Sequence, residues 1–156
     1  MSHYTKVKTR LTNKESLLKA LEDMGFVKEQ VKVSDVAMRL EGYNGDLRQD
    51  TAEIILPRKH VGGASNDIGF KLQEDGTYGA IISEYDQNNS AADYKSKYAK
   101  GCHGYSATWL KRLNQRYAYH QVKEQISSQG FFIESESEEN GEILLKVNAA
   151  AFVGGE

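Results

Sequence analysis

Three basic side chains and a tyrosine recur at helical spacing within residues 109–129, WLKRLNQRYAYHQVKEQISSQ. At 100° per residue, Arg112, Arg116 and Lys123 fall within about 40° of one another, with Tyr119 beside them. Arginine binds phosphate and carboxylate groups in a fork, and tyrosine stacks on bases. These four residues, called the basic column below, therefore predict a surface for a protein partner or for nucleic acid. The outer, solvated face of a helix is the alternative that this spacing leaves open.

A second basic surface is predicted near the start of the chain. Residues alternate in Tyr4–Leu11, so that Lys6, Lys8 and Arg10 share one side. This pattern predicts a half-buried strand with a cationic outer face. If the ligand is a nucleic acid, this face and the basic column would both contribute to binding it.

Acidic residues gather in the last predicted hairpin. Glu134, Glu136 and Glu138 alternate, which would place them on one face of a strand, and Glu139 and Glu142 follow. Paired carboxylates can carry out acid–base chemistry or hold a divalent ion. We favour the other interpretations, a solvated face or a strand edge protected by charge. The same hairpin could also pair with the basic column and neutralise it.

The remaining chemical patterns are incomplete. Cys102 is the only cysteine, and adjacent residues such as Cys102 and His103 seldom chelate one ion. The loop of residues 60–65, HVGGAS, lacks the Gly-Lys-Ser/Thr ending of a phosphate-binding loop. His120, at the edge of an apolar stripe, is more typical of a structural histidine than of a base. We therefore expect no metal, no cofactor and no catalytic thiol.

One long helix must carry the basic column. No proline interrupts residues 104–128, and Gly130 stands where a glycine commonly ends a helix. The apolar residues form two sectors rotated from each other, Trp109, Leu110, Leu113 and Tyr117 in the first and Ala118, Tyr119, Val122 and Ile126 in the second. We expect this helix to pass under two parts of a sheet. The predicted shared core contains Leu113, Val122, Ile126, Phe70 and Ile82.

The other predicted elements are shorter. Thr12 and Glu15 have the spacing of a capping box, which predicts a helix ending at Gly25. Further strands are predicted at Val31–Leu40, Ala52–Leu56, Asp67–Leu72, Tyr78–Ser83, Phe131–Ser137 and Ile143–Val147. Residues 60–66 are expected to be a flexible loop, and residues 86–104 a connection with either a short helix capped by Ser90 or no regular structure. The fold class is α+β, with a single antiparallel or mixed sheet of about six to seven strands and two main helices packed on one face.

Composition fits one domain. The chain has 156 residues, of which 39% are hydrophobic and 27% charged, as in ordinary globular proteins. We expect a single α+β domain over residues 1–148 and a flexible tail at 149–156. The net charge of −2 argues against nonspecific binding of polyanions by the whole chain, so any basic patch is local. The single cysteine fits a reducing compartment, and no apolar run approaches the length of a membrane span.

Several stretches carry a family resemblance. Leu113–Phe131, LNQRYAYHQVKEQISSQGF, resembles the signature of the hypothetical chloroplast reading frame thirty-five family. Similar stretches occur in the same order at SHYTKVKTRL, LEGYNG, TAEIIL, DIGF and DGTYG, so the resemblance covers most of residues 2–147. The resemblance implies a setting in cyanobacteria, red-lineage plastids or cyanophages. The family has no established enzymatic activity, so the resemblance assigns no catalytic residues to this chain. The chain departs from the family at residues 86–104 and after Asn148.

We expect a noncatalytic binding or adaptor protein that acts through a protein partner. A nucleic-acid-binding module that uses the basic column and the Lys6/Lys8/Arg10 face is the alternative. A small enzyme is the third class, and the sequence offers no complete catalytic constellation for it. The expected location is the cytoplasm, the plastid stroma, or the host cytoplasm if a phage encodes the chain. The oligomeric state is left open.

Overall fold

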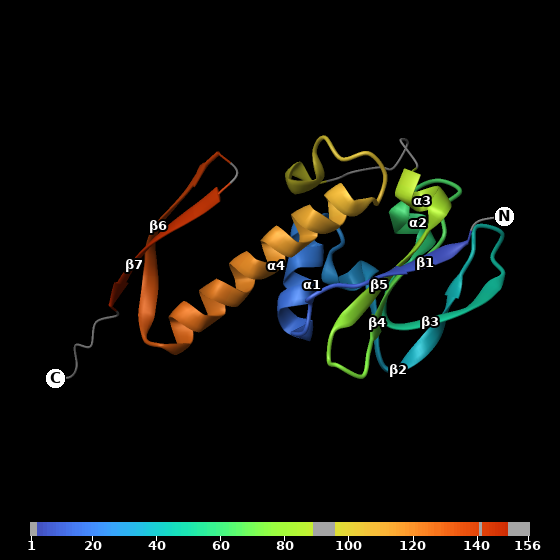
Figure 1. Ribbon diagram of the computed structural model, residues 1–156, viewed down its shortest axis with the longest axis horizontal. Helices are drawn as coiled ribbons and strands as arrows, with labels where there is room; N and C mark the ends of the chain where they lie inside the picture. Colours follow the sequence, from blue (N-terminus) through green and yellow to red (C-terminus); the bar gives the residue numbers. More distant parts are fainter. Residues whose placement is uncertain (1–2, 89–95, 141, 150–156) are drawn as a thin grey trace.

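The molecule is elongated, with a five-stranded sheet at one end and a two-stranded hairpin at the other (Figure 1). A long helix runs from the sheet to the hairpin. This computed structural model describes residues 3–88, 96–140 and 142–149. Ser90, the predicted cap of a short helix, and residues 150–156 of the predicted tail lie outside these ranges.

The main sheet is antiparallel throughout, in the order β1-β5-β4-β3-β2. Its strands are β1 (Tyr4–Val7), β2 (Lys32–Glu41), β3 (Leu47–Leu56), β4 (Ile68–Leu72) and β5 (Tyr78–Ser83). The predicted hairpin between β4 and β5 is confirmed, with Phe70 opposite Ala80. At its turn, the backbone N–H and the hydroxyl of Thr77 both donate to the Asp75 carboxylate, which accounts for the local chain reversal.

Two of the helices are long enough to cover the sheet. The helices are α1 (Lys14–Asp23), α2 (Arg58–Val61), α3 (Glu84–Asn88) and α4 (Ala107–Ser128), with 3₁₀ turns η1 (Lys28–Gln30) and η2 (Lys97–Ala99). The cap of α1 differs from the prediction, because the Asn13 side chain rather than that of Thr12 accepts from Ser16 N at 2.9 Å. Gly130, with a φ of +83°, follows the end of α4 as predicted. Within the described ranges, no helix is long and apolar enough to cross a membrane.

The core lies between α1, α4 and one face of the main sheet. Leu17 and Leu21 of α1 and Trp109 and Leu113 of α4 are fully buried in the same cluster as Phe70 of the sheet. A smaller cluster covers the opposite face and consists of Leu40, Ala52, Ile55 and Ile81. The predicted α+β class, with both main helices on one face of an antiparallel sheet, is therefore confirmed.

The two sectors of α4 have different surroundings. The first sector, Trp109, Leu110, Leu113 and Tyr117, is buried as predicted. The predicted burial of Val122 and Ile126 is wrong, because Val122 is 42% exposed and Ile126 is only half-buried. With 22 residues, α4 is about 33 Å long and extends beyond the sheet, so only its first half is covered.

The last two strands also differ from the prediction. Strands β6 (Phe131–Glu139) and β7 (Glu142–Ala149) form their own two-stranded sheet, whereas a single sheet was expected. The antiparallel pairing and the turn at Asn140 are as predicted. The hairpin packs on α4 and does not join the core, because α4 carries it away from the main sheet (Figure 1).

Candidate functional site

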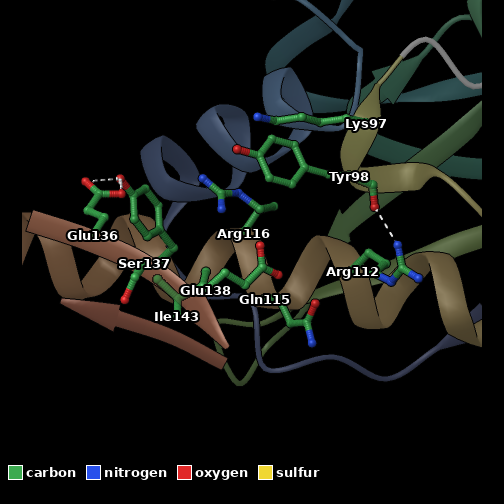
Figure 2. A pocket seen from close by; sticks show the side chains of 10 residues that line it. Lys97, Tyr98, Arg112, Gln115, Arg116, Glu136, Ser137, Glu138 and Ile143 are labelled. Atoms are coloured by element: carbon green, nitrogen blue, oxygen red, sulfur yellow. Dashed lines mark hydrogen bonds between the residues drawn. The ribbon is translucent and has the colours of Figure 1, made fainter. Parts of the chain in front are cut away.

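Three residues of the basic column, Arg116, Tyr119 and Lys123, belong to a stack of alternating cations and aromatic rings. The Cζ atom of Arg116 lies 4.1 Å from the ring centroid of Tyr98 and 4.3 Å from that of Tyr119. The Nζ atom of Lys97 lies 5.2 Å from the Tyr98 centroid, and that of Lys123 lies 5.2 Å from the Tyr119 centroid. Each such contact contributes roughly 0.5–2 kcal/mol. We call these five residues the cation–aromatic stack, of which Figure 2 labels Lys97, Tyr98 and Arg116.

Arg116 is largely buried and forms an ion pair within the protein. Its Nε–H donates to Asp23 Oδ2 at 2.8 Å, and His120 Nε2 lies 2.7 Å from the same oxygen. Only 12% of the Arg116 side chain is exposed. Because Asp23 ends α1 and Arg116 lies on α4, this contact ties the two main helices together. The predicted position of Arg116 on the exposed side of the helix is therefore wrong, and so is the alternative of a purely solvated face at this residue. His120 also has a structural contact.

Arg112 holds the segment around η2 against α4. Its Nη1 atom donates to the carbonyl oxygens of Tyr98 at 3.0 Å and Lys100 at 3.1 Å. The same segment is fixed at its other side, because the hydroxyl of Ser96 donates to the carbonyl oxygen of Asp23. These bonds place Tyr98 over Arg116 (Figure 2). Sequence reasoning missed Lys97, Tyr98 and Asp23, since nothing periodic links them to α4.

A cleft of about 620 Å³ opens beside the stack, between α4, η2 and the β6–β7 hairpin. It is lined by Lys97, Tyr98, Arg112, Gln115, Arg116, Tyr119, Glu136, Ser137, Glu138 and Ile143. One wall is basic and aromatic, and the other is acidic (Figure 2). A smaller hollow of about 290 Å³ continues along α4 and is lined in part by Ala118, Val122 and Leu145. The exposed second sector of α4 thus forms an apolar extension of the cleft.

A tyrosine–glutamate contact joins the two walls. The Tyr119 hydroxyl donates to the Glu136 carboxylate, with distances of 2.7 and 2.8 Å to its two oxygens. Partial burial, and next the bond to Glu136, raise the pKa of Tyr119, which favours the protonated hydroxyl that donates to Glu136. The open possibility that the acidic hairpin pairs with the basic column is thus realised at one residue of that column.

The glutamates of β6 do not share one face as predicted. The pairing with β7 slips between Ile133 and Ser135, so Glu134 is an extra residue in a β-bulge. Glu136 and Glu138 face the cleft, whereas Glu134 lies 3.6 Å from Lys146 of β7. The alternation rule failed here because a bulge shifts every following side chain to the other face.

The second basic surface is separate from the cleft. Lys6, Lys8 and Arg10 are exposed as predicted, but β1 ends at Val7, so Lys8 and Arg10 follow the strand. In the ranges that the structure describes, none of the three lines the cleft. The fold therefore does not bring the two predicted basic surfaces into one site.

Cys102 is half-buried, and burial raises the pKa of its thiol. A raised pKa leaves less thiolate at neutral pH, which is opposite to the tuning of catalytic cysteines. Among the described residues, no group of three or more His, Cys, Asp or Glu side chains could hold a metal ion.

A buried polar network was also missed by sequence reasoning. Asp86 is fully buried, and its Oδ2 atom accepts from the Ser83 hydroxyl at 2.8 Å and from Asn66 N at 3.1 Å. Asp67 accepts from the backbone N–H groups of Glu41 and Arg58 at 2.8 and 2.7 Å, and burial raises its pKa. This network fixes Asn66 and Asp67 against the sheet. The expectation of a flexible loop over residues 60–66 is wrong at both ends, because His60 and Val61 belong to α2 and Asn66 is held by this network.

Comparisons with known proteins agree with the predicted resemblance. The family described as "Protein of unknown function (DUF1257)" matches residues 20–145. An uncharacterized protein named ycf35 from Cyanophora paradoxa is 28% identical over 148 residues, which are 94% of this chain and 96% of the relative. A protein of the same name from Pyropia yezoensis is 26% identical over 151 residues, with the same coverage. No solved structure matches the chain.

These matches confirm the resemblance that was predicted from Leu113–Phe131 and the accompanying motifs. The match extends from α1 into β7, so it includes the cation–aromatic stack and the cleft. The chain is similar to the ycf35 proteins of Cyanophora paradoxa and Pyropia yezoensis, and it belongs to the DUF1257 family of proteins of unknown function.

Proposed function

We propose that this protein is a noncatalytic binding domain that acts through a protein partner, and that the cleft beside α4 receives an extended segment of that partner. The observation that carries this proposal is the cleft itself, with a basic and aromatic wall, an acidic wall and an apolar extension. A segment with charged, polar and apolar side chains has a complementary group for each part.

The rigidity of the cation–aromatic stack supports a binding role. Tyr98 and Tyr119 are held against Arg116, which Asp23 fixes in turn. Such a wall loses little conformational entropy when a ligand binds, so more of the contact energy contributes to affinity. Within the protein, Arg112 donates through Nη1 and Arg116 donates through Nε. We expect the partner to contact the positive charge that both guanidinium groups keep and the faces of the tyrosine rings.

The test uses a substitution that fills the cleft without breaking its wall. Gln115 is exposed and lines the cleft, so Gln115→Trp should block it. Asn114→Trp is the matched control, because Asn114 is the exposed neighbour on α4 that does not line the cleft. In pull-downs from a cyanobacterial lysate, the protein retained by the wild type should be lost only with Gln115→Trp. Equal retention by all three chains would contradict the proposal.

A nucleic-acid-binding module is the second candidate, favoured by the exposed basic residues Lys6, Lys8 and Arg10. This role predicts RNA or DNA binding that weakens steeply with salt and is lost when these three residues are changed to glutamate. Nuclease treatment of the same pull-downs distinguishes the candidates, because it should leave a direct protein partner bound. By the names of its relatives we further propose a photosynthetic setting, in the cytoplasm or the plastid stroma.

A further inference from the structure

The outer edge of β7 is open for pairing with another strand. In the described part of the chain, β6 and β7 pair only with each other, and both edges of their sheet lack a third strand. Isolated two-stranded sheets are marginally stable, and open edges are templates for strand addition. We propose that β7 pairs antiparallel with β7 of a second copy of this chain, in a register centred on Leu144.

The composition of the two strands favours β7 over β6 as the pairing edge. Four of the nine residues of β6 are glutamates, and a run of like charge protects an edge against pairing with its own kind. By contrast, β7 has the sequence EILLKVNA, with one acidic and one basic residue around apolar ones. Leu144 and Val147 are among the exposed large hydrophobic side chains.

The geometry of the hairpin restricts the register. Glu139 and Glu142 are the partners that flank the turn, so they form its closing hydrogen-bonded pair. Because hydrogen-bonded and non-hydrogen-bonded pairs alternate, Leu144 directs its backbone groups toward β6. Ile143 and Leu145 direct theirs to the free edge. A second β7 must therefore bond to Ile143 and Leu145, and a twofold axis at Leu144 places these two residues opposite each other.

Charge complementarity selects this register among its neighbours. With the axis at Leu144, Glu142 lies opposite Lys146 of the second copy, and the pair occurs twice. These are non-hydrogen-bonded positions, where side chains approach closely. With the axis at Leu145, Glu142 would face Asn148 and no ion pair would form. With the axis at Lys146, two lysines would face each other, which is unfavourable.

Glu142 also has a local reason to accept a cation from outside. It lies directly opposite Glu139 in the hairpin, and like charges at such positions destabilise a sheet. Within the described ranges, neither glutamate has an ion pair. Lys146 is 69% exposed and is 3.6 Å from Glu134, so it has room for a second carboxylate. Pairing at Glu142 would relieve the repulsion in both copies.

The pairing is independent of the proposed binding of a partner in the cleft. The edge contact uses backbone groups of β7, whereas the side chains of Ile143 and Leu145 line the cleft. Two copies joined in this way would form a four-stranded sheet with a cleft on each copy. The fold would thus present two binding sites of the same kind.

The pairing is tested by reversing the charges of Glu142 and Lys146 and measuring association. The measurement is sedimentation equilibrium of the full chain over a range of concentrations. The wild type should be a dimer. Glu142→Lys alone or Lys146→Glu alone creates two like-charge pairs and should weaken the dimer about tenfold or more. An equimolar mixture of the two single variants restores both opposite-charge pairs and should form a heterodimer. The double variant Glu142→Lys/Lys146→Glu should also recover the wild-type association.

The mixture controls for damage within one hairpin, because each chain keeps its own substitution and only the contact between chains is repaired. Lys111→Glu, an exposed substitution on α4, repeats one charge change away from β7 and should leave the dimer intact. A monomeric wild type at all concentrations would overturn the proposal. So would single variants that associate like the wild type, or a mixture that stays as weak as its components.

Discussion

Arg116 on α4 donates its Nε–H to the carboxylate of Asp23, the last residue of α1, at 2.8 Å. This hydrogen bond helps to position both the two main helices and the cation–aromatic stack, together with the contacts of His120 to Asp23 and of Ser16 to Gln121. Asp23 also accepts from Ser96 through its backbone carbonyl, so the same residue holds the η2 segment. The basic wall of the cleft therefore depends on a contact at the end of a helix that does not itself line the cleft.

Replacing Arg116 should destabilise the protein. Arg116→Ala removes a hydrogen bond between charged groups and two stacking contacts, so we expect a loss of about 2–4 kcal/mol in the free energy of unfolding. Urea denaturation measures this loss. Lys111→Ala is the control, since Lys111 is exposed on the same helix and should change stability by less than about 0.5 kcal/mol. Equal effects of the two substitutions would show that the Asp23 contact contributes nothing.

Because α4 is unevenly buried, alanine substitutions in its two apolar sectors should reduce the free energy of unfolding by different amounts. Leu113 is fully buried, and Leu113→Ala should cost about 2–5 kcal/mol through lost contacts and a cavity. Val122 is 42% exposed, so Val122→Ala should cost less than about 1 kcal/mol. Thermal or urea unfolding of both variants provides the comparison. A Val122→Ala loss as large as that of Leu113→Ala would mean that the hairpin closes over α4 in solution.

Leu113 and Val122 also indicate what the sequence could and could not predict. Helical periodicity identified both apolar sectors of α4 correctly, because it depends only on local geometry. It could not tell which sector is covered, since coverage depends on where the sheet ends relative to the helix. For the same reason the antiparallel hairpins were predictable from alternation and turn residues, but their division into two sheets was not.

The candidate site shows the same limit. Helical spacing placed Arg112, Arg116 and Tyr119 together on one wall of the cleft. The fourth predicted residue, Lys123, does not line the cleft and contacts the ring of Tyr119. Tyr98 and Asp23 come from separate segments and meet this wall only through tertiary contacts. The bulge at Glu134 likewise has no marker such as glycine, so strict alternation misplaced that residue.

Cys102 should react slowly with alkylating reagents. Burial raises its pKa, so the thiolate fraction at pH 8 is smaller than that of a free cysteine. The rate with iodoacetamide should rise with pH and reach its midpoint above the ordinary thiol value. The urea-unfolded chain serves as the control, because its Cys102 is fully solvated and should react faster at pH 8. A native thiol that reacts faster than the unfolded one would contradict this assignment.

The bond between Tyr119 and Glu136 should hold the hairpin against α4. Tyr119→Phe removes the hydroxyl but keeps the ring that stacks on Arg116, so the core should be unaffected. We expect faster amide hydrogen exchange in β6 and β7, with unchanged exchange in β4 and β5. Ser137→Ala is a control on the same hairpin. Unchanged exchange in Tyr119→Phe would mean that other contacts position the hairpin.

The central claim is that the cleft beside α4 binds a protein partner, and site-specific photo-cross-linking tests it most directly. A photoreactive phenylalanine analogue would replace Gln115 in the cleft or, as a control, Asn114 on the neighbouring exposed surface. After illumination in a nuclease-treated cyanobacterial lysate, position 115 should cross-link to one protein and position 114 should not. Cross-links at equal yield from both positions, or none from position 115, would contradict the claim.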